Sequence, residues 1–174
     1  MKTCLTSLAL ISALSLASPL ALAAPEAGDR SLTLSGTGNS DDSFDTNAFG
    51  VSGSIGWFTS DVLEIGIRQS ANGLIVDDGE DSWSGSTRAF VDYHFNTGTM
   101  VIPFIGANLG GIYGDGVEES GTAGVEAGAK FYVKEKTFIM GMVEWQYLFE
   151  DADEIDNNFD DGAFFYTLGI GYNF

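Results

Sequence analysis

The sequence predicts an all-β protein, an eight-stranded antiparallel up-and-down transmembrane β-barrel. Eight segments alternate apolar with small or polar residues at a period of two, which is the period of a strand with two different faces. The connections between these segments are alternately long and short. Seventeen of the 25 acidic residues fall in the long connections, and an antiparallel barrel gathers such connections at one end.

Residues 1–23 have the features of a secretory signal. Lys2 precedes the apolar run Leu5–Leu16, and residues 21–23 (Ala-Leu-Ala) form a small-x-small cleavage pattern. Cleavage there removes Cys4, the only cysteine, and with it any disulfide, zinc–thiolate or thiol chemistry. The predicted domains are a cleaved signal peptide at 1–23, a short segment at 24–29 and a membrane β-barrel at 30–174.

The charge balance excludes some classes of partner. After loss of Lys2 the chain has six basic and 25 acidic residues, a net charge of −19. A nucleic-acid partner is excluded because phosphate binding needs a basic patch. Aromatic residues make up 13% of the chain, unlike a disordered acidic protein. The mature chain has no apolar run of about 18 residues, so no membrane-spanning helix is predicted.

The first four predicted strands are 31–38, 49–58, 62–70 and 85–95. In the third, Leu63, Ile65 and Ile67 alternate with small or charged residues. The last four are 101–113, 123–133, 138–149 and 164–174, and the final one places six large apolar side chains on one face. Each segment has about ten residues, the length that a tilted barrel strand needs to cross a bilayer.

The two faces predict which side meets lipid. The polar face is largely Gly and Ser with isolated charges, which is unsuited to a water-exposed surface. The apolar face carries aromatic residues at its ends, among them Tyr93, Phe95, Tyr172 and Phe174. Aromatic residues bordering an apolar band are typical of a membrane barrel, so we expect the apolar face to point outward.

The connections predict the orientation. The long ones are 39–47, 71–82, 114–120 and 150–162, and the short ones are 59–61, 96–99 and 134–136. Outer-membrane barrels carry long loops outside the cell and short turns in the periplasm, so both chain termini are expected to be periplasmic. The long loops contain no Lys or Arg; their acidic residues are Asp41, Asp42, Asp45, Asp77, Asp78, Glu80, Asp81, Asp115, Glu118, Glu119, Glu150, Asp151, Asp153, Glu154, Asp156, Asp160 and Asp161.

Two motifs resemble those of small eight-stranded outer-membrane barrels of Gram-negative bacteria, the OmpA-like and OmpX/Ail-like superfamily. The segment "TLGIGYNF" ends on Tyr172 and Phe174 and is similar to the C-terminal signal read by the barrel-assembly machinery. The segment "IPFIGANLGGIYG" (102–114) resembles a strand found in many of these proteins. The resemblance covers residues 30–174 and implies assembly in the outer membrane by that machinery.

Charged residues on the small, polar face are expected inside the barrel. They are Glu64, Arg68, Arg88, Asp92, Glu126, Lys130 and Glu144. An eight-stranded barrel is just wide enough for side chains to fill it, and buried charges need partners. A salt-bridge network that closes the lumen is therefore predicted, with a narrow gated ion path as the alternative. Bulky inward residues such as Phe58, Phe90 and Phe104 favour a closed interior.

His94 is the only histidine and the one candidate for a catalytic base. Small barrels include lipid A deacylases and palmitoyltransferases, whose histidine lies at the outer rim. His94 is predicted at the periplasmic end, with no nucleophile and separate orienting acid nearby. We therefore predict a structural histidine and a protein that is not an enzyme.

The acidic loops are candidates for weak cation binding. Residues 151–162 fit no register of the EF-hand loop, because glycine and the closing acid fall at the wrong positions. Clustered carboxylates without counter-ions still suggest loose association of Ca²⁺ or Mg²⁺. The residues expected to contribute most are Asp151, Asp153, Asp156, Asp160 and Asp161.

The sequence as a whole predicts a monomeric structural or surface-interaction barrel of the outer membrane, with a narrow pore and a lipid-modifying enzyme as second and third alternatives. The expected surroundings are outer-membrane lipid and lipopolysaccharide. No cofactor is expected beyond loosely bound divalent cations.

Overall fold

The computed structural model describes residues 25–40, 47–75, 82–114, 120–149 and 162–174. These contain eight strands: β1 (Arg30–Ser40), β2 (Asn47–Ser60), β3 (Leu63–Ile75), β4 (Ser82–His94), β5 (Val101–Gly114), β6 (Ser120–Tyr132), β7 (Thr137–Phe149) and β8 (Gly162–Asn173). Within these described ranges there is no helix long and apolar enough to cross a membrane.

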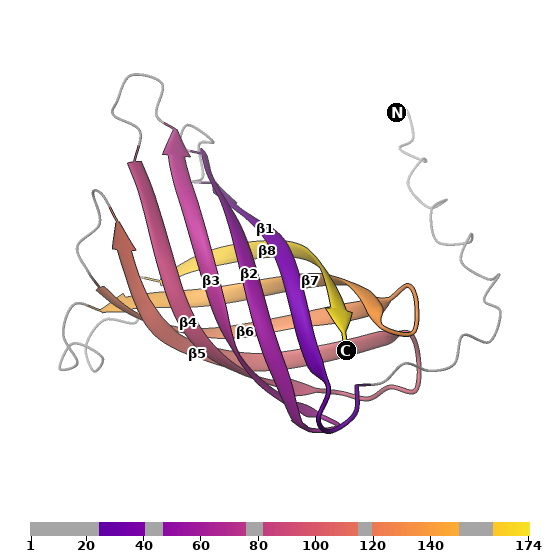
Figure 1. Ribbon diagram of the computed structural model, residues 1–174. Coiled ribbons are helices and arrows are strands. Elements are labelled where there is room, and N and C mark those ends of the chain that lie inside the picture. The colour runs from indigo at the N-terminus through magenta and orange to yellow at the C-terminus, as the bar shows by residue number, and fades with distance from the viewer. Residues whose placement is uncertain (1–24, 41–46, 76–81, 115–119, 150–161) are drawn as a thin grey trace, which may run out of the picture.

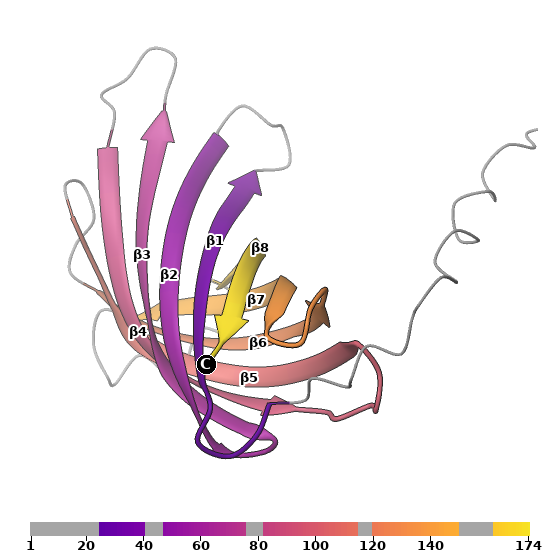
Figure 2. The same ribbon diagram turned by 45° about the vertical axis from the view of Figure 1, so that its right-hand side comes forward.

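The strands form a closed antiparallel barrel in sequence order (Figure 1). The last strand pairs with the first, from Ser31 opposite Asn173 to Gly38 opposite Tyr166, and β1 and β8 lie side by side in Figure 2. At the closing seam, Arg30 and Phe174 exchange two backbone hydrogen bonds of 2.9 Å. Closure leaves no unpaired strand edge, which is a requirement for strands in lipid. The predicted fold class is confirmed.

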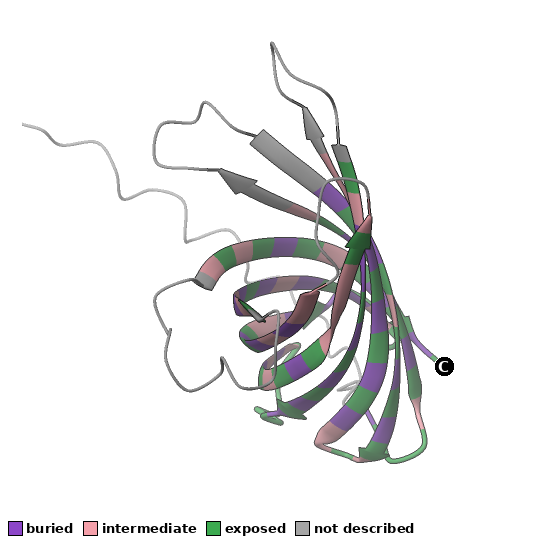
Figure 3. Ribbon diagram, turned by 90° about the vertical axis from the view of Figure 1, so that its left-hand side faces the viewer, coloured by how far each residue is buried: buried purple, intermediate pink, exposed green. Residues whose placement is uncertain are grey.

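Exposed and buried residues alternate along the strands (Figure 3). Outward residues such as Leu34 and Leu168 are 65% and 68% exposed, whereas inward residues such as Glu64 and Phe104 are 1% exposed. The outer surface is therefore apolar, and charged groups lie inside. This is the inverse of a water-soluble protein, and it suits a barrel whose outer solvent is lipid.

The strands have 11 to 14 residues and so exceed the predicted length of about ten. The difference is at the ends of the predicted long loops 39–47 and 71–82. There β2 already begins at Asn47, which pairs with Ile75 at the end of β3. Backbone hydrogen bonds do not require apolar side chains, so the ladder continues past the point where alternation stops in the sequence.

The segment before β1 lies against the connection between β2 and β3. The backbone N–H of Ala27 donates to Asp61 Oδ1 over 2.9 Å, and that of Gly28 to the carbonyl of Phe58 over 2.8 Å. Gly28 has a φ of +99°, a conformation that favours glycine. The predicted signal peptide lies outside the described residues.

Candidate functional site

The structure places all seven of the predicted lumen charges inside the barrel, each no more than 7% exposed. They come from four strands: Glu64 and Arg68 from β3, Arg88 and Asp92 from β4, Glu126 and Lys130 from β6, and Glu144 from β7. Because side chains on one face of a strand recur every second residue, these inward positions follow directly from the alternation. Six of the seven side chains form ion pairs, in two groups.

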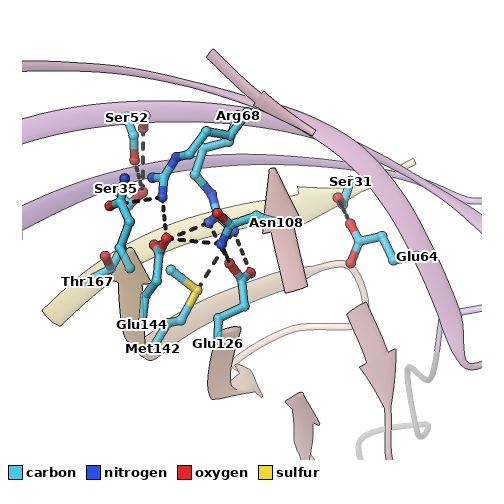
Figure 4. Close-up of polar contacts among 12 residues, drawn as sticks. Ser31, Ser35, Ser52, Glu64, Arg68, Asn108, Glu126, Met142, Glu144 and Thr167 are labelled. Carbon is cyan, nitrogen blue, oxygen red and sulfur yellow. Dashed lines mark hydrogen bonds and ion pairs between the residues drawn. The ribbon is translucent and has the colours of Figure 1, made fainter. Parts of the chain in front are cut away.

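The first group lies near the middle of its strands, and we call it the middle network: Arg68, Arg88, Asn108, Glu126 and Glu144. Figure 4 labels all of these residues except Arg88. Arg68 donates two parallel hydrogen bonds to Glu126, of 2.8 and 2.9 Å, and lies 3.8 Å from Glu144. Arg88 bonds directly to Glu144. The amide of Asn108 donates to Glu126 over 2.6 Å and to Glu144 over 3.0 Å, which joins the two carboxylates.

The walls of the middle network complete its contacts. Gln146 Oε1 accepts a 3.5 Å bond from Arg88, while Gln146 Nε2 donates to the hydroxyl of Thr122. The guanidinium of Arg68 lies 5.1 Å from the centre of the Phe90 ring and 3.7 Å from the sulfur of Met142. Two arginines and two carboxylates are thus neutralised within five neighbouring strands, β3 to β7.

The second group lies at the barrel end where β1 begins and β8 ends, and we call it the terminal cluster: Ser31, Glu64, His94 and Lys130. Glu64 Oε2 accepts from Lys130 Nζ over 2.7 Å and lies 2.9 Å from His94 Nε2. The other oxygen of Glu64 accepts from the Ser31 hydroxyl. One carboxylate therefore gathers three partners from β1, β4 and β6.

Aromatic rings surround the terminal cluster. The ammonium of Lys130 lies 5.3 Å from the centre of the Phe58 ring and 4.8 Å from that of Phe138, within the range of cation–π attraction. The His94 ring lies 5.1 Å from Phe58 and 5.4 Å from Phe104. Adjoining residues make a continuous apolar layer: Ile102, Phe104, Tyr132, Phe138, Met140 and Met142.

Inward glycines provide the space for these long side chains. A Cβ at Gly56 would meet the Glu64 carboxylate, one at Gly110 would meet Arg88, and one at Gly128 would meet the Phe104 ring. Each of these glycines lies on a neighbouring strand, under a side chain that crosses it. Inward glycines therefore leave room for long side chains from the neighbouring strand, and we call these glycine positions sockets. The sequence analysis did not recognise this role.

Beside the middle network, the inward side chains of β8, β1 and β2 include several small hydroxyl residues. Ser35 and Ser52 are hydrogen-bonded over 2.7 Å, and Thr37 and Thr167 over 3.3 Å. These strands contribute no charged residue to the interior. The charged side chains of β3, β4, β6 and β7 thus share the lumen with a wall of small residues.

Sequence analysis also missed the neutral residues that connect the charges. Ser31, Asn108, Thr122 and Gln146 all bond to a charged residue or its partner. Their only sequence signal is an inward position in the alternation, which they share with many other residues. Their role depends on which strands are neighbours and on how the strands are staggered.

Glu64, Asp92 and His94 are the only described group whose spacing could hold a metal ion, with donor atoms within 4.8 Å of one another. The Lys130 ammonium already supplies a cation to the shared Glu64 oxygen at 2.7 Å, and we assign no metal to these residues. The loop carboxylates proposed for weak cation binding, Asp151, Asp153, Asp156, Asp160 and Asp161, lie outside the described residues. Tyr172 and Phe174 point outward, each 48% exposed.

A closed eight-stranded barrel with an apolar exterior and a paired polar interior defines a small outer-membrane β-barrel. The sequence agrees with this class, because the OprF membrane domain family matches residues 21–174. The chain belongs to that family. None of the curated proteins that were compared matches the chain.

Solved structures of similar shape are small barrels as well. The N-terminal β-barrel domain of Pseudomonas aeruginosa OprF has 24% identity and a TM-score of 0.55, over 84% of this chain and 98% of that one. OprG from Pseudomonas aeruginosa has 14% identity and a TM-score of 0.63, over 88% and 99%. Neisserial surface protein A has 17% identity and a TM-score of 0.58, over 85% and 96%. These likenesses agree on the fold.

Proposed function

We propose that this outer-membrane barrel is a structural, surface-interaction protein whose lumen is closed by its own side chains. The supporting observation is the lumen's internal pairing. Arg68, Arg88 and Lys130 each bond to a carboxylate of the same chain, and large rings fill the barrel end where β1 begins and β8 ends. Cations paired in this way need neither water nor a solute as their counter-ion.

Conductance across a planar bilayer tests the closed lumen. The refolded barrel is expected to give no steady single-channel current. A narrow pore is the competing function, and the wall of Ser and Thr hydroxyls on β8, β1 and β2 is the feature that favours it. Steady currents in the wild type that change in Arg88→Ala or Glu144→Ala would replace our proposal with that function.

The same proposal includes the absence of enzymatic activity. His94 is 1% exposed and its Nε2 faces Glu64, while the nearby Ser31 hydroxyl donates to Glu64 and not to the imidazole. A catalytic base must reach the proton that it removes, and this histidine faces only the interior. Hydrolysis or acyl transfer on lipid A that disappears in His94→Gln would contradict this part of the proposal.

The long acidic loops are proposed to be extracellular, and the termini periplasmic. Support comes from topology: the β1–β2, β3–β4, β5–β6 and β7–β8 connections leave the barrel at the end opposite the paired residues Arg30 and Phe174. Labelling of single cysteines in intact cells tests it. Residue 154 should react with a membrane-impermeant thiol reagent and residue 135 should not.

Insertion by the barrel-assembly machinery is proposed to depend on the outward-facing Tyr172 and Phe174. Tyr172 lies at the end of β8, and Phe174 follows the strand and pairs with Arg30 at the closing seam. Deletion of Phe174 is expected to lower the yield of heat-modifiable barrel in outer-membrane fractions. An unchanged yield would show that this C-terminal signal is not required.

The acidic loops are further proposed to collect Ca²⁺ or Mg²⁺ and to couple the barrel rim to lipopolysaccharide. The four loops contain seventeen acidic residues and no Lys or Arg. Lipopolysaccharide is itself anionic, so cations are needed between the two. Melting with and without Ca²⁺ tests this in wild type and in a variant with Asn at the five loop aspartates from Asp151 to Asp161. At matched ionic strength, equal stabilisation by Na⁺ would reduce the loops to a solvated acidic surface.

A further inference from the structure

The described lumen contains one more carboxylate than it has permanent cations. Four acidic side chains, those of Glu64, Asp92, Glu126 and Glu144, lie with two arginines and one lysine. Glu64, Glu126 and Glu144 each form an ion pair with a cation within 4 Å. Asp92 takes part in none of the ion pairs among the described residues. The excess carboxylate is therefore that of Asp92, on β4.

Asp92 is held away from water and from cations. Its side chain is 3% exposed, and its Oδ1 has no hydrogen-bond partner. That oxygen lies against β5, in the space that a Gly106 side chain would fill. One oxygen of Asp92 also lies within 4.8 Å of an oxygen of Glu64, a second carboxylate.

A second negative charge so close to Glu64, in a buried place without a cation of its own, is costly, and an acid in such a place binds a proton instead. We propose that Asp92 carries a proton and is a buried proton-binding site of the folded barrel. With that proton bound, the lumen has three negative and three positive charges. Glu126 is not the acid that carries the proton, since it already accepts two bonds from Arg68 and one from Asn108.

The charged neighbours of the site act in both directions. Glu64 and Glu126 repel an ionised Asp92, whereas Arg68 and Lys130 attract it. Both of these cations already form ion pairs with other carboxylates, Arg68 with Glu126 and Lys130 with Glu64. On β4 itself, Arg88 is bonded to Glu144. No charged residue of β1, β2, β5 or β8 points into the lumen.

A proton on His94 would balance the charge count equally well, but its surroundings disfavour that. The Lys130 ammonium already bonds to the Glu64 oxygen that His94 faces, so a second cation there would be repelled. His94 Nδ1 has no partner, and in an imidazolium it would be a buried donor without an acceptor. Asp92 is therefore the better place for the proton.

Infrared spectroscopy of the barrel refolded in phospholipid vesicles at neutral pH tests the site directly. The wild type should show the carbonyl band of a protonated carboxylic acid, shifted in D₂O. Asp92→Asn should lose the band, and Asp61→Asn, an exposed acid in the β2–β3 connection, should keep it. No such band in the wild type, its persistence in Asp92→Asn, or its loss in Asp61→Asn would each overturn the proposal.

Stability against pH provides a second readout. A folded state that binds an extra proton loses stability as rising pH removes that proton. The urea midpoint of the wild type should fall between neutral and alkaline pH by more than that of Asp92→Asn, which mimics the protonated acid and cannot ionise. Asp61→Asn should follow the wild type. Parallel curves for wild type and Asp92→Asn would count against a proton bound at Asp92.

Discussion

The two charged groups in the lumen have similar chemistry but different surroundings. In the middle network, Arg68 and Arg88 face Glu126 and Glu144, and the other contacts are mostly amides, hydroxyls and a thioether. In the terminal cluster, a single lysine–glutamate pair is enclosed by phenylalanine rings and joined by His94 and Ser31.

The difference shows two ways of making an interior without water. The middle network depends on mutual neutralisation, so each charge needs the others. The terminal cluster combines one ion pair with apolar packing, and Glu64 retains two further partners if its lysine is removed. Loss of one charge should therefore cost more in the middle of the barrel than at its end.

Arg68→Met should give the largest effect. It removes both hydrogen bonds to Glu126 and leaves two carboxylates with one arginine. Breaking a buried pair in this way costs about 3–5 kcal/mol. Urea unfolding in lipid vesicles, followed by tryptophan fluorescence, measures the loss. Arg68→Lys should lie between wild type and Met, because lysine keeps the charge but not the two-pronged geometry.

Lys130→Met should cost less, about 1–3 kcal/mol, the range for a buried group that loses one of several partners. Methionine keeps an apolar chain between Phe58 and Phe138, and Glu64 keeps His94 and Ser31. The same unfolding assay applies. If Lys130→Met and Arg68→Met were equally destabilising, the aromatic enclosure would contribute nothing, and the distinction between the two groups would fail.

Gly128→Ala tests whether the sockets matter at the terminal end. The new methyl group would meet the Phe104 ring and the backbone of Gly141, and overpacking of this kind costs about 1–3 kcal/mol. Gly141→Ala on the next strand is the matched control, because nothing lies within 4 Å of its Cβ position. It should change the stability by less than about 0.5 kcal/mol. Similar losses in both variants would point to a general need for glycine.

The smallest of these effects should be that of salt. Added NaCl should hardly change the difference in unfolding free energy between Arg68→Met and Lys130→Met. Side chains in both groups are almost entirely buried, and buried pairs are screened far less than exposed ones. The difference in unfolding free energy between the two variants should change by less than about 0.5 kcal/mol from low to high NaCl, which is about the error within which independent effects add. A gap that closes in high salt would mean that ions reach the middle network.

The sequence was sufficient to predict the fold because the signal is local. Alternation in segments such as 62–70 requires only that a strand places successive side chains on opposite faces. It separates Ile65 from Glu64 whichever strand lies beside them, and so it identified all seven inward charges. The strand ends were less accurate, since the ladder between Asn47 and Ile75 is maintained by the backbone and leaves no alternation to read.

The pairing inside the lumen was decided by the tertiary structure. Glu64 and Lys130 are 66 residues apart, and Arg68 and Glu126 are 58 apart. Whether such residues meet depends on how the closed strands are staggered, which no local pattern encodes. The sequence by itself determined that four acids and three permanent cations face inward. Only closure of the barrel decided that Asp92, which lies over Gly106, is the acid left without a cation.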